Sequence, residues 1–175
     1  RLALRQRAID DWNTLRTDGA TLMLAGTRAE AHQLNQLARE SLADTGELDL
    51  DRAVLLGGRS YAPGEHVILR RNHRGQHLSD GTEFAVDNGM RGRLSQIDAT
   101  GAHVRLDSGG EIVLDREYLA AGWLDYGYAS TVHTAQGVTC DHVLVVGPAG
   151  LYREAVYVAM SRARLSAWIY GTTAE

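Results

Sequence analysis

The chain has 175 residues, of which 44% are hydrophobic and 23% charged, as is usual for one globular domain or one domain with a small insert. Its formal net charge of −4 excludes a protein that holds DNA through bulk positive charge, so any nucleic-acid contact must come from local patches. No apolar run approaches the roughly 20 residues that a membrane span needs, and we expect a cytoplasmic protein without a membrane partner.

The N-terminal segment has the pattern of alternating helices and strands. Apolar residues at helical spacing predict a helix over residues 2–16. The apolar run Thr21–Ala25 is typical of a strand buried in a parallel sheet. A second helix is predicted over 29–43, with Thr27 as its N-cap and Glu30 completing a capping box.

The pattern changes to short β-strands near residue 51. Glycine, asparagine and aspartate turns separate the apolar runs and divide them into short segments. The predicted strands cover residues 54–56, 66–70, 92–97, 103–106 and 111–114. So many short strands in so little chain predict a small barrel that resembles an SH3 fold.

After residue 122 the α/β pattern returns. The predicted elements are a strand over 123–128, a helix over 130–136, a strand over 142–146, a helix over 152–164 and a strand over 166–170. The predicted fold is therefore α/β, a parallel sheet with flanking helices that is interrupted by a small β-barrel insert. We expect a sheet domain formed by 1–50 and 121–175, and an insert over 51–120. Because the chain opens inside a predicted helix, we expect an excised piece of a longer protein.

The segment 128–139 carries the first chemical signal. Ser130 and Thr131 can cap a helix that leaves a strand, and the first amides of such a helix favour a phosphate group. His133 follows within the first turn, where its ring could stack on a base or bond a phosphate. Gln136 and Gly137 end the predicted helix and allow close approach of a second ligand. An ordinary capped surface helix remains the alternative.

The second signal is Arg162, near the end of the helix predicted over 152–164. A rigid, permanently charged guanidinium can neutralise the charge that grows on a γ-phosphate held by a neighbouring domain. The alternative is an arginine that interacts only with the last carbonyl groups of its own helix.

Residue counts exclude several other chemistries. All 18 basic residues are arginine, so the chain has no phosphate-binding P-loop lysine and no lysine nucleophile. The single cysteine, Cys140, excludes an internal disulfide. His73 and His77 have ligand-like spacing, but Gly75 between them disfavours the helix that this spacing needs, and we expect no metal site.

A serine hydrolase is disfavoured as well. Ser130, His133 and Asp141 are the residue types of a catalytic triad, but they crowd one short segment. The chain also has no Gly-x-Ser-x-Gly elbow, the turn that exposes the nucleophile in one large class of hydrolases.

Together the two segments resemble motifs V and VI of the RecD-like branch of superfamily 1 DNA helicases. The sequence is especially similar to the helicase part of MobF-type conjugative relaxases (the TraA, TraI and TrwC group). Residues 128–139 resemble motif V and 157–164 resemble motif VI, while 21–39 resemble the opening of the second RecA-like domain, 2A. Gly64–Val67 and Asn88–Gly92 resemble the SH3-like insert of that branch.

The resemblance implies roles for individual residues. Arg162 would be the catalytic arginine finger, and ATP with Mg²⁺ would be held mainly by an N-terminal RecA-like domain that this chain lacks. The nucleotide edge would be formed by Gln136, Gly137 and Thr139, although many relatives carry glutamate where Thr139 stands. Single-stranded DNA would contact Ser130, Thr131 and His133, with Arg28 and Asn35 on the same groove.

The predicted insert contains a basic cluster at a strand end. Its arginines are Arg70, Arg71 and Arg74, which we expect to grip a DNA backbone, since phosphate contact needs only charge and reach. A solvated hairpin tip is the alternative. Two functions follow from these residues: the C-terminal motor domain of an ATP-dependent helicase, or a non-catalytic nucleic-acid-binding module that uses the barrel.

Overall fold

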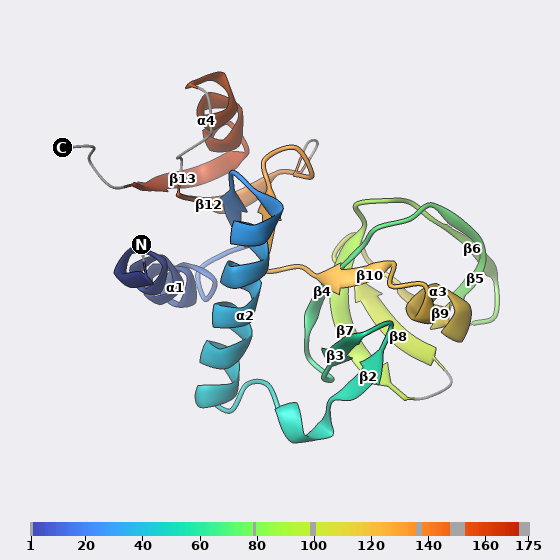
Figure 1. Cartoon of the computed structure of the whole chain (residues 1–175). Coiled ribbons are helices and arrows are strands. Elements are labelled where there is room, and N and C mark those ends of the chain that lie inside the picture. Colours follow the sequence, from blue (N-terminus) through green and yellow to red (C-terminus); the bar gives the residue numbers. More distant parts are fainter. Residues whose placement is uncertain (1, 79, 99–100, 136–137, 148–152, 172–175) are drawn as a thin grey trace. The chain divides into compact units, whose positions relative to one another are not determined.

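A computed structural model describes residues 2–78, 80–98, 101–135, 138–147 and 153–171. The chain divides into two compact units (Figure 1). Unit 1 combines residues 1–41 with 128–175, and unit 2 is the continuous segment 42–127. Unit 2 therefore interrupts unit 1 in the sequence and extends beyond the insert predicted over 51–120.

Unit 1 is built around a four-stranded parallel sheet, with the strand order β11-β1-β12-β13. Its elements are α1 (Leu2–Leu15), β1 (Thr21–Ala25), α2 (Arg28–Asp44), β11 (Ala129–Thr131), β12 (Cys140–Val146), α4 (Arg153–Met160) and β13 (Ala163–Tyr170), of which α2 continues into unit 2. The predicted α/β fold with a parallel sheet and flanking helices is confirmed.

The sheet of unit 1 is apolar because both of its faces are covered. Alternate residues of β1 and β12, such as Leu24 and Val145, join one buried cluster with Ala159 of α4. The opposite face carries Met23 and Leu144, and α1 packs against β1 and β12. Strands covered on both faces have nearly continuous apolar sequences, which explains why these two strands could be predicted.

The start of α2 follows its predicted capping. The backbone N–H of Glu30 donates to Thr27 Oγ1 at 3.1 Å, and the N–H of Ala31 donates to the carbonyl of Thr27 at 3.0 Å. The hydroxyl thus satisfies one of the amides that a helix leaves open at its first turn.

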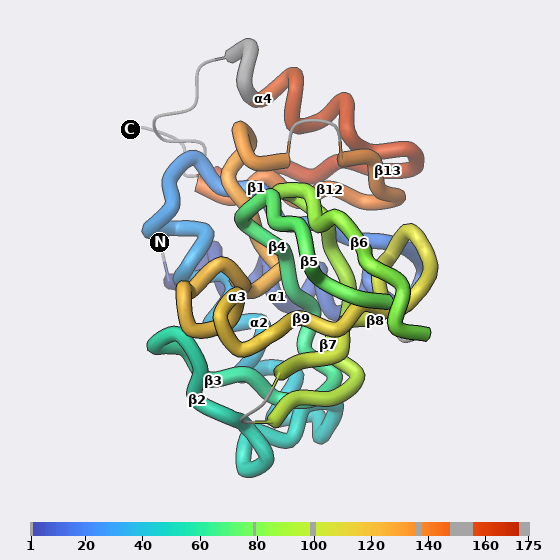
Figure 2. Tube along the Cα trace, turned by 90° about the vertical axis from the view of Figure 1, so that its right-hand side faces the viewer, coloured from blue at the N-terminus to red at the C-terminus, as the bar shows by residue number. Residues whose placement is uncertain are grey.

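Unit 2 contains a seven-stranded antiparallel sheet, with the order β10-β4-β7-β8-β9-β5-β6, and a separate hairpin of β2 and β3. Its elements are η1 (Leu50–Arg52), β2 (Val54–Leu56), β3 (Arg59–Tyr61), β4 (His66–Leu69), β5 (His73–Leu78), β6 (Glu83–Val86), β7 (Arg91–Ile97), β8 (Gly101–Leu106), β9 (Glu111–Asp115), α3 (Arg116–Ala120) and β10 (Leu124–Tyr126). Figure 2 traces β7, β8 and β9 as neighbouring strands. Closure of this sheet into an SH3-like barrel stays a prediction.

Three predicted elements need correction. The strand predicted over 123–128 is β10, which pairs antiparallel with β4 in unit 2 and not with the parallel sheet. The helix predicted over 130–136 is replaced by the end of β11 and a turn over 132–135. The helix predicted over 152–164 ends at Met160, because the chain turns there and enters β13.

Asp115 is the N-cap of α3, and it gives the stability of the chain a pH dependence. Burial acts to raise the pKa of Asp115, but hydrogen bonds from the Tyr118 amide at 2.7 Å and the Gln76 side chain at 2.9 Å outweigh it and lower this pKa. A carboxylate with a lowered pKa stabilises the fold above its unfolded pKa, and this contribution is lost as the pH falls through the folded value.

We therefore expect the free energy of unfolding to fall between about pH 5 and pH 3, and the Asp115→Asn variant to lose less over the same interval. Asparagine keeps an oxygen that can accept from the Tyr118 amide but does not titrate. Urea denaturation at several pH values measures the difference. If the free energy of unfolding falls with pH equally in the unchanged chain and in Asp115→Asn, Asp115 is not the source of this pH dependence.

Candidate functional site

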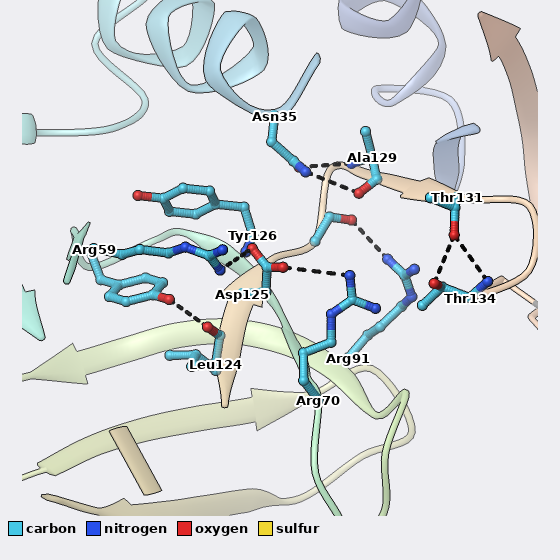
Figure 3. Close-up of polar contacts among 12 residues, drawn as sticks. Asn35, Arg59, Arg70, Arg91, Leu124, Asp125, Tyr126, Ala129, Thr131 and Thr134 are labelled. Atoms are coloured by element: carbon cyan, nitrogen blue, oxygen red, sulfur yellow. Dashed lines mark hydrogen bonds and ion pairs between the residues drawn. The ribbon is translucent and has the colours of Figure 1, made fainter. Parts of the chain in front are cut away.

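The segment that follows β11 forms one tight turn, which we call the Thr131 turn (residues 131–135). Thr131 Oγ1 accepts from the Thr134 amide at 3.3 Å and lies 2.8 Å from the Thr134 hydroxyl (Figure 3). The Ala135 amide donates to the Thr131 carbonyl at 3.1 Å. Thr131 therefore caps a single turn, as its residue type predicted, although no longer helix follows in the described residues.

Apolar residues hold the Thr131 turn on the core of unit 1. Val132 and Ala135 are buried in the same cluster as Leu24 and Val145, and Val138 packs against that cluster. Between these anchors the side chain of His133 is exposed. The turn is thus rigidly attached through its apolar residues and presents an imidazole to solvent.

The carboxyl ends of β1 and β11 lie side by side. Ala25 pairs with Thr131, and the chain after Ala25 runs directly into α2, whose first residue, Arg28, is exposed. The amino end of α2 and the Thr131 turn therefore share one edge of the sheet. In open α/β sheets, ligands bind outside this carboxyl edge.

Two other predicted contacts of DNA are buried. Ser130 has a relative exposure of 0% and Asn35 of 5%. The side-chain amide of Asn35 forms two hydrogen bonds with the backbone of Ala129 (Figure 3). Neither side chain is accessible from solvent in this structure, and the contact of either residue with DNA stays a prediction.

Arg162 lies at the other end of the strands, where β12 and β13 begin. The chain leaves α4 through a turn in which the Arg162 amide donates to the Ala159 carbonyl at 3.2 Å. The carbonyl of Arg162 then accepts from the Cys140 amide at 3.0 Å, which fixes Arg162 beside the first residue of β12. Thr139, which is exposed, directly precedes Cys140. The structure thus brings Arg162 and Thr139 together.

The two arginines of this turn differ in their partners. Arg164 forms an ion pair with Asp141, with 2.8 Å between Nη2 and Oδ1. The hydrogen bond from the Ala20 amide is the main cause that lowers the pKa of Asp141; burial opposes it, and the charge of Arg164 lowers this pKa further. By contrast, the half-buried side chain of Arg162 has no hydrogen-bond or ion-pair partner among the residues that the structure describes.

Segment 132–139 connects the two edges, because it starts at the carboxyl end of β11 and ends at the amino end of β12. The predicted nucleotide contacts Gln136 and Gly137 belong to this segment but lie outside the described residues. The remaining predicted site residues of unit 1 fall into two groups: Thr131, His133 and Arg28 at the carboxyl edge, and Thr139 with Arg162 at the amino edge.

The basic cluster of unit 2 is only partly exposed. Arg70 is tied to Asp125, with 3.4 Å between Nη2 and Oδ2, and Arg59 binds the same carboxylate at 2.6 Å (Figure 3). The side chains of Arg71 and Arg74 are exposed, although Arg74 lies within β5 and not at a strand end. Two of the three predicted arginines are therefore available to a partner.

Aromatic rings beside Arg71 were missed by the sequence analysis. The Arg71 guanidinium lies 5.8 Å from the centroid of the Trp123 ring, and this ring packs edge-to-face with that of Tyr118 at 5.3 Å. His73 contacts both rings. Tyr118 lies in α3 and His73 in β5, whereas Arg71 follows β4 and Trp123 precedes β10. Because the cluster joins segments far apart in the sequence, no local pattern indicates it.

Within the described residues, no three histidine, cysteine, aspartate or glutamate side chains are placed to hold a metal ion together. A search of the same residues for a helix long and apolar enough to cross a membrane finds none.

Comparison with known proteins finds similarity to helicases and to conjugal transfer proteins. The model of the UvrD-like helicase C-terminal domain matches residues 126–170, which include the Thr131 turn and Arg162. A probable conjugal transfer protein TraA of Sinorhizobium fredii is 32% identical over 172 residues, and a conjugal transfer protein TraA of Agrobacterium fabrum is 29% identical over 168 residues. Each alignment covers 94% of this chain but only 15% of the relative.

Solved structures support the fold at low sequence identity. The chain is similar to Bacteroides Pif1 bound to ssDNA, with a TM-score of 0.55 and 17% identity over 85% of this chain and 40% of that one. A structure of Pif1 helicases at forked duplex DNA gives a TM-score of 0.57 and 18% identity over 86% of this chain and 39% of that one.

Proposed function

We propose that the chain is a C-terminal domain of a superfamily 1 helicase and forms one half of an ATP-driven motor that moves along single-stranded DNA. The chain spans 15% of the length of the curated TraA relatives, so the motor is completed by other parts of a longer polypeptide. This chain contains no lysine and therefore no P-loop lysine to bind the phosphates of ATP. In our proposal, ATP and Mg²⁺ are held mainly by an N-terminal RecA-like domain of the longer polypeptide. By analogy with those relatives, the parent protein serves conjugal DNA transfer.

The observation that carries this proposal is the difference between Arg162 and Arg164. Arg164 has its charge compensated by Asp141, whereas Arg162 is held by its backbone and has no described side-chain partner. A guanidinium that is positioned but uncompensated suits a transient anion, such as the γ-phosphate of ATP during transfer to water. Arg162 is therefore the proposed arginine finger.

The carboxyl edge of the sheet supplies the proposed DNA track. The hydroxyl of Thr131, the ring of His133 and the guanidinium of Arg28 project from adjacent strand ends. Hydroxyl and charged groups at such an edge suit the phosphates of a single strand, and an imidazole can also stack on a base.

A second candidate function rests on unit 2. Arg71 over the Trp123 ring, with Arg74 exposed in β5, combines charge with an aromatic surface, as non-catalytic single-strand binders do. In this alternative, unit 2 binds the nucleic acid and unit 1 is a scaffold.

Binding of the 175-residue chain to a fluorescent dT oligonucleotide distinguishes the two functions. We expect the double variant Thr131→Ala/His133→Ala to bind about tenfold more weakly, since each lost contact with a phosphate or base is worth about 1 kcal/mol or more. The variant Arg71→Ala/Arg74→Ala should lose less affinity than the Thr131→Ala/His133→Ala variant. It should also show a shallower dependence of affinity on salt concentration than the unchanged chain.

Arg105→Ala is the matched control, because it removes an exposed arginine of β8 outside both groups. A loss confined to the Arg71/Arg74 variant would favour the binding module. Unchanged binding in the Thr131/His133 variant would refute the proposed DNA track in unit 1.

A further inference from the structure

β11 is the edge strand of the described parallel sheet, with β1 on one side. The carbonyl of Tyr128 accepts from the Met23 amide at 3.3 Å, and the Val132 amide donates to the Ala25 carbonyl at 3.3 Å. In a parallel strand the backbone groups of alternate residues point in opposite directions. The N–H and C=O of Ala129 therefore point away from β1, toward the side where no further strand is described.

The side chain of Asn35 pairs with these two backbone groups, as a neighbouring strand would. Its Nδ2 donates to the Ala129 carbonyl at 3.0 Å, and its Oδ1 accepts from the Ala129 amide at 2.8 Å (Figure 3). The side-chain amide thus reproduces the donor and acceptor pair of a neighbouring backbone. Asn35 is 5% exposed and Ala129 is 2% exposed, so water cannot replace either bond. An unpaired buried backbone group is strongly disfavoured.

We propose that Asn35 is a positioning residue for the DNA track: through its amide, α2 holds β11 at Ala129 and thereby sets where the Thr131 turn projects. Only Ser130 separates Ala129 from Thr131, and a three-residue strand has few other bonds to fix it. The same helix begins with Arg28, so Asn35 also fixes the spacing of Arg28 from Thr131. This inference rests on the proposed function, in which these groups bind a single strand.

The Asn35→Asp variant gives a test that a general loss of stability cannot imitate. The Asn35→Asp carboxylate can accept from the Ala129 amide but repels its carbonyl, whereas the protonated acid regains the donor that the carbonyl needs. Burial raises the pKa of such a group, so the acid forms under mildly acidic conditions. Asn35→Leu has a similar volume and cannot regain the donor at any pH.

The measurement is the affinity of the 175-residue chain for a dT oligonucleotide, expressed relative to the unchanged chain at the same pH. Asn35→Asp should bind about tenfold more weakly at about pH 8 and within about twofold at about pH 5.5, whereas Asn35→Leu should be about tenfold weaker at both. A pH-independent ratio for Asn35→Asp, or full affinity of Asn35→Leu, would overturn the proposal.

Hydrogen exchange supplies a readout that does not need DNA. The amides of Thr134 and Ala135 both bond to Thr131, and we expect them to exchange about tenfold faster in Asn35→Leu. Asn13→Leu is the matched control: it removes another asparagine bond of unit 1, that of Asn13 Nδ2 to Ser41 Oγ at 2.7 Å, without touching β11.

The two measurements separate the possible failures. If the unchanged chain does not bind the oligonucleotide, the proposed DNA track fails, and faster exchange in Asn35→Leu still establishes the positioning of the turn. If exchange at Thr134 and Ala135 stays unchanged, or rises equally in Asn13→Leu, the positioning role fails whatever the affinity.

Discussion

Replacing Arg162 with alanine should lower the rate of ATP hydrolysis about 10³-fold in a polypeptide that joins this chain to its P-loop domain. The arginine is fixed by the hydrogen bond of its carbonyl to the Cys140 amide, so its loss leaves the neighbouring backbone in place. What disappears is the positive charge that would stabilise the transferring phosphoryl group. Steady-state ATPase rates, with and without single-stranded DNA, measure the effect.

Arg164→Ala is the control for the charge of the same turn. Its guanidinium is largely exposed and paired with Asp141, and such surface pairs contribute little. ATP hydrolysis by this variant should remain close to that of the unchanged polypeptide. An Arg162→Ala protein that retains most of its ATPase activity, or an Arg164→Ala protein that loses as much, would assign the arginine finger elsewhere.

Gly92→Ala should destabilise the chain by about 3 kcal/mol, at the upper end of the usual cost of overpacking. Gly92 lies in the middle of the antiparallel sheet of unit 2, where β7 pairs with both β4 and β8. A Cβ atom there would collide with the carbonyl oxygen of Arg105 and would lie 2.8 Å from a methyl group of Val104. Because the nearest atom belongs to the backbone, the strands themselves must move apart.

Urea denaturation of the purified chain measures this change in the free energy of unfolding. Gln96→Ala is the control, since it alters an exposed residue of the same strand and should change stability by less than about 0.5 kcal/mol. Equal unfolding midpoints for Gly92→Ala and Gln96→Ala would show that β7 and β8 separate without cost, against the close approach described here.

Much of unit 1 was predictable because burial on both faces leaves a simple sequence pattern. β1 agrees with its predicted run residue for residue, and Thr27 caps α2 as its residue type suggested. The strand β11 was not predicted, because its sequence, Ala-Ser-Thr, is equally suited to cap a helix. Its identity as a strand depends on β1 and on Asn35, which is 94 positions away from Ala129.

Unit 2 was less predictable in its polar strands. β5 contains histidine, arginine, glycine and glutamine with little alternation, so its pairing with β6 and β9 had no local signal. The candidate site shows the same division. The residue types of the motifs pointed to Arg162 and Thr131. The sequence did not reveal that Asn35 and Ser130 are buried, or that aromatic rings lie beside Arg71, because these features arise from contacts between distant segments.

Because unit 2 interrupts the sequence of unit 1, the strands of the parallel sheet are synthesised in two separate stages. β1 lies between β11 and β12, so both of its partners are synthesised only after the whole of unit 2. Until then its apolar side chains have no sheet to join, and long-range pairing of this kind is slow and open to aggregation. Unit 2, being continuous, can complete its folding on the nascent chain, whereas β1 must wait until residues 128–146 have been synthesised.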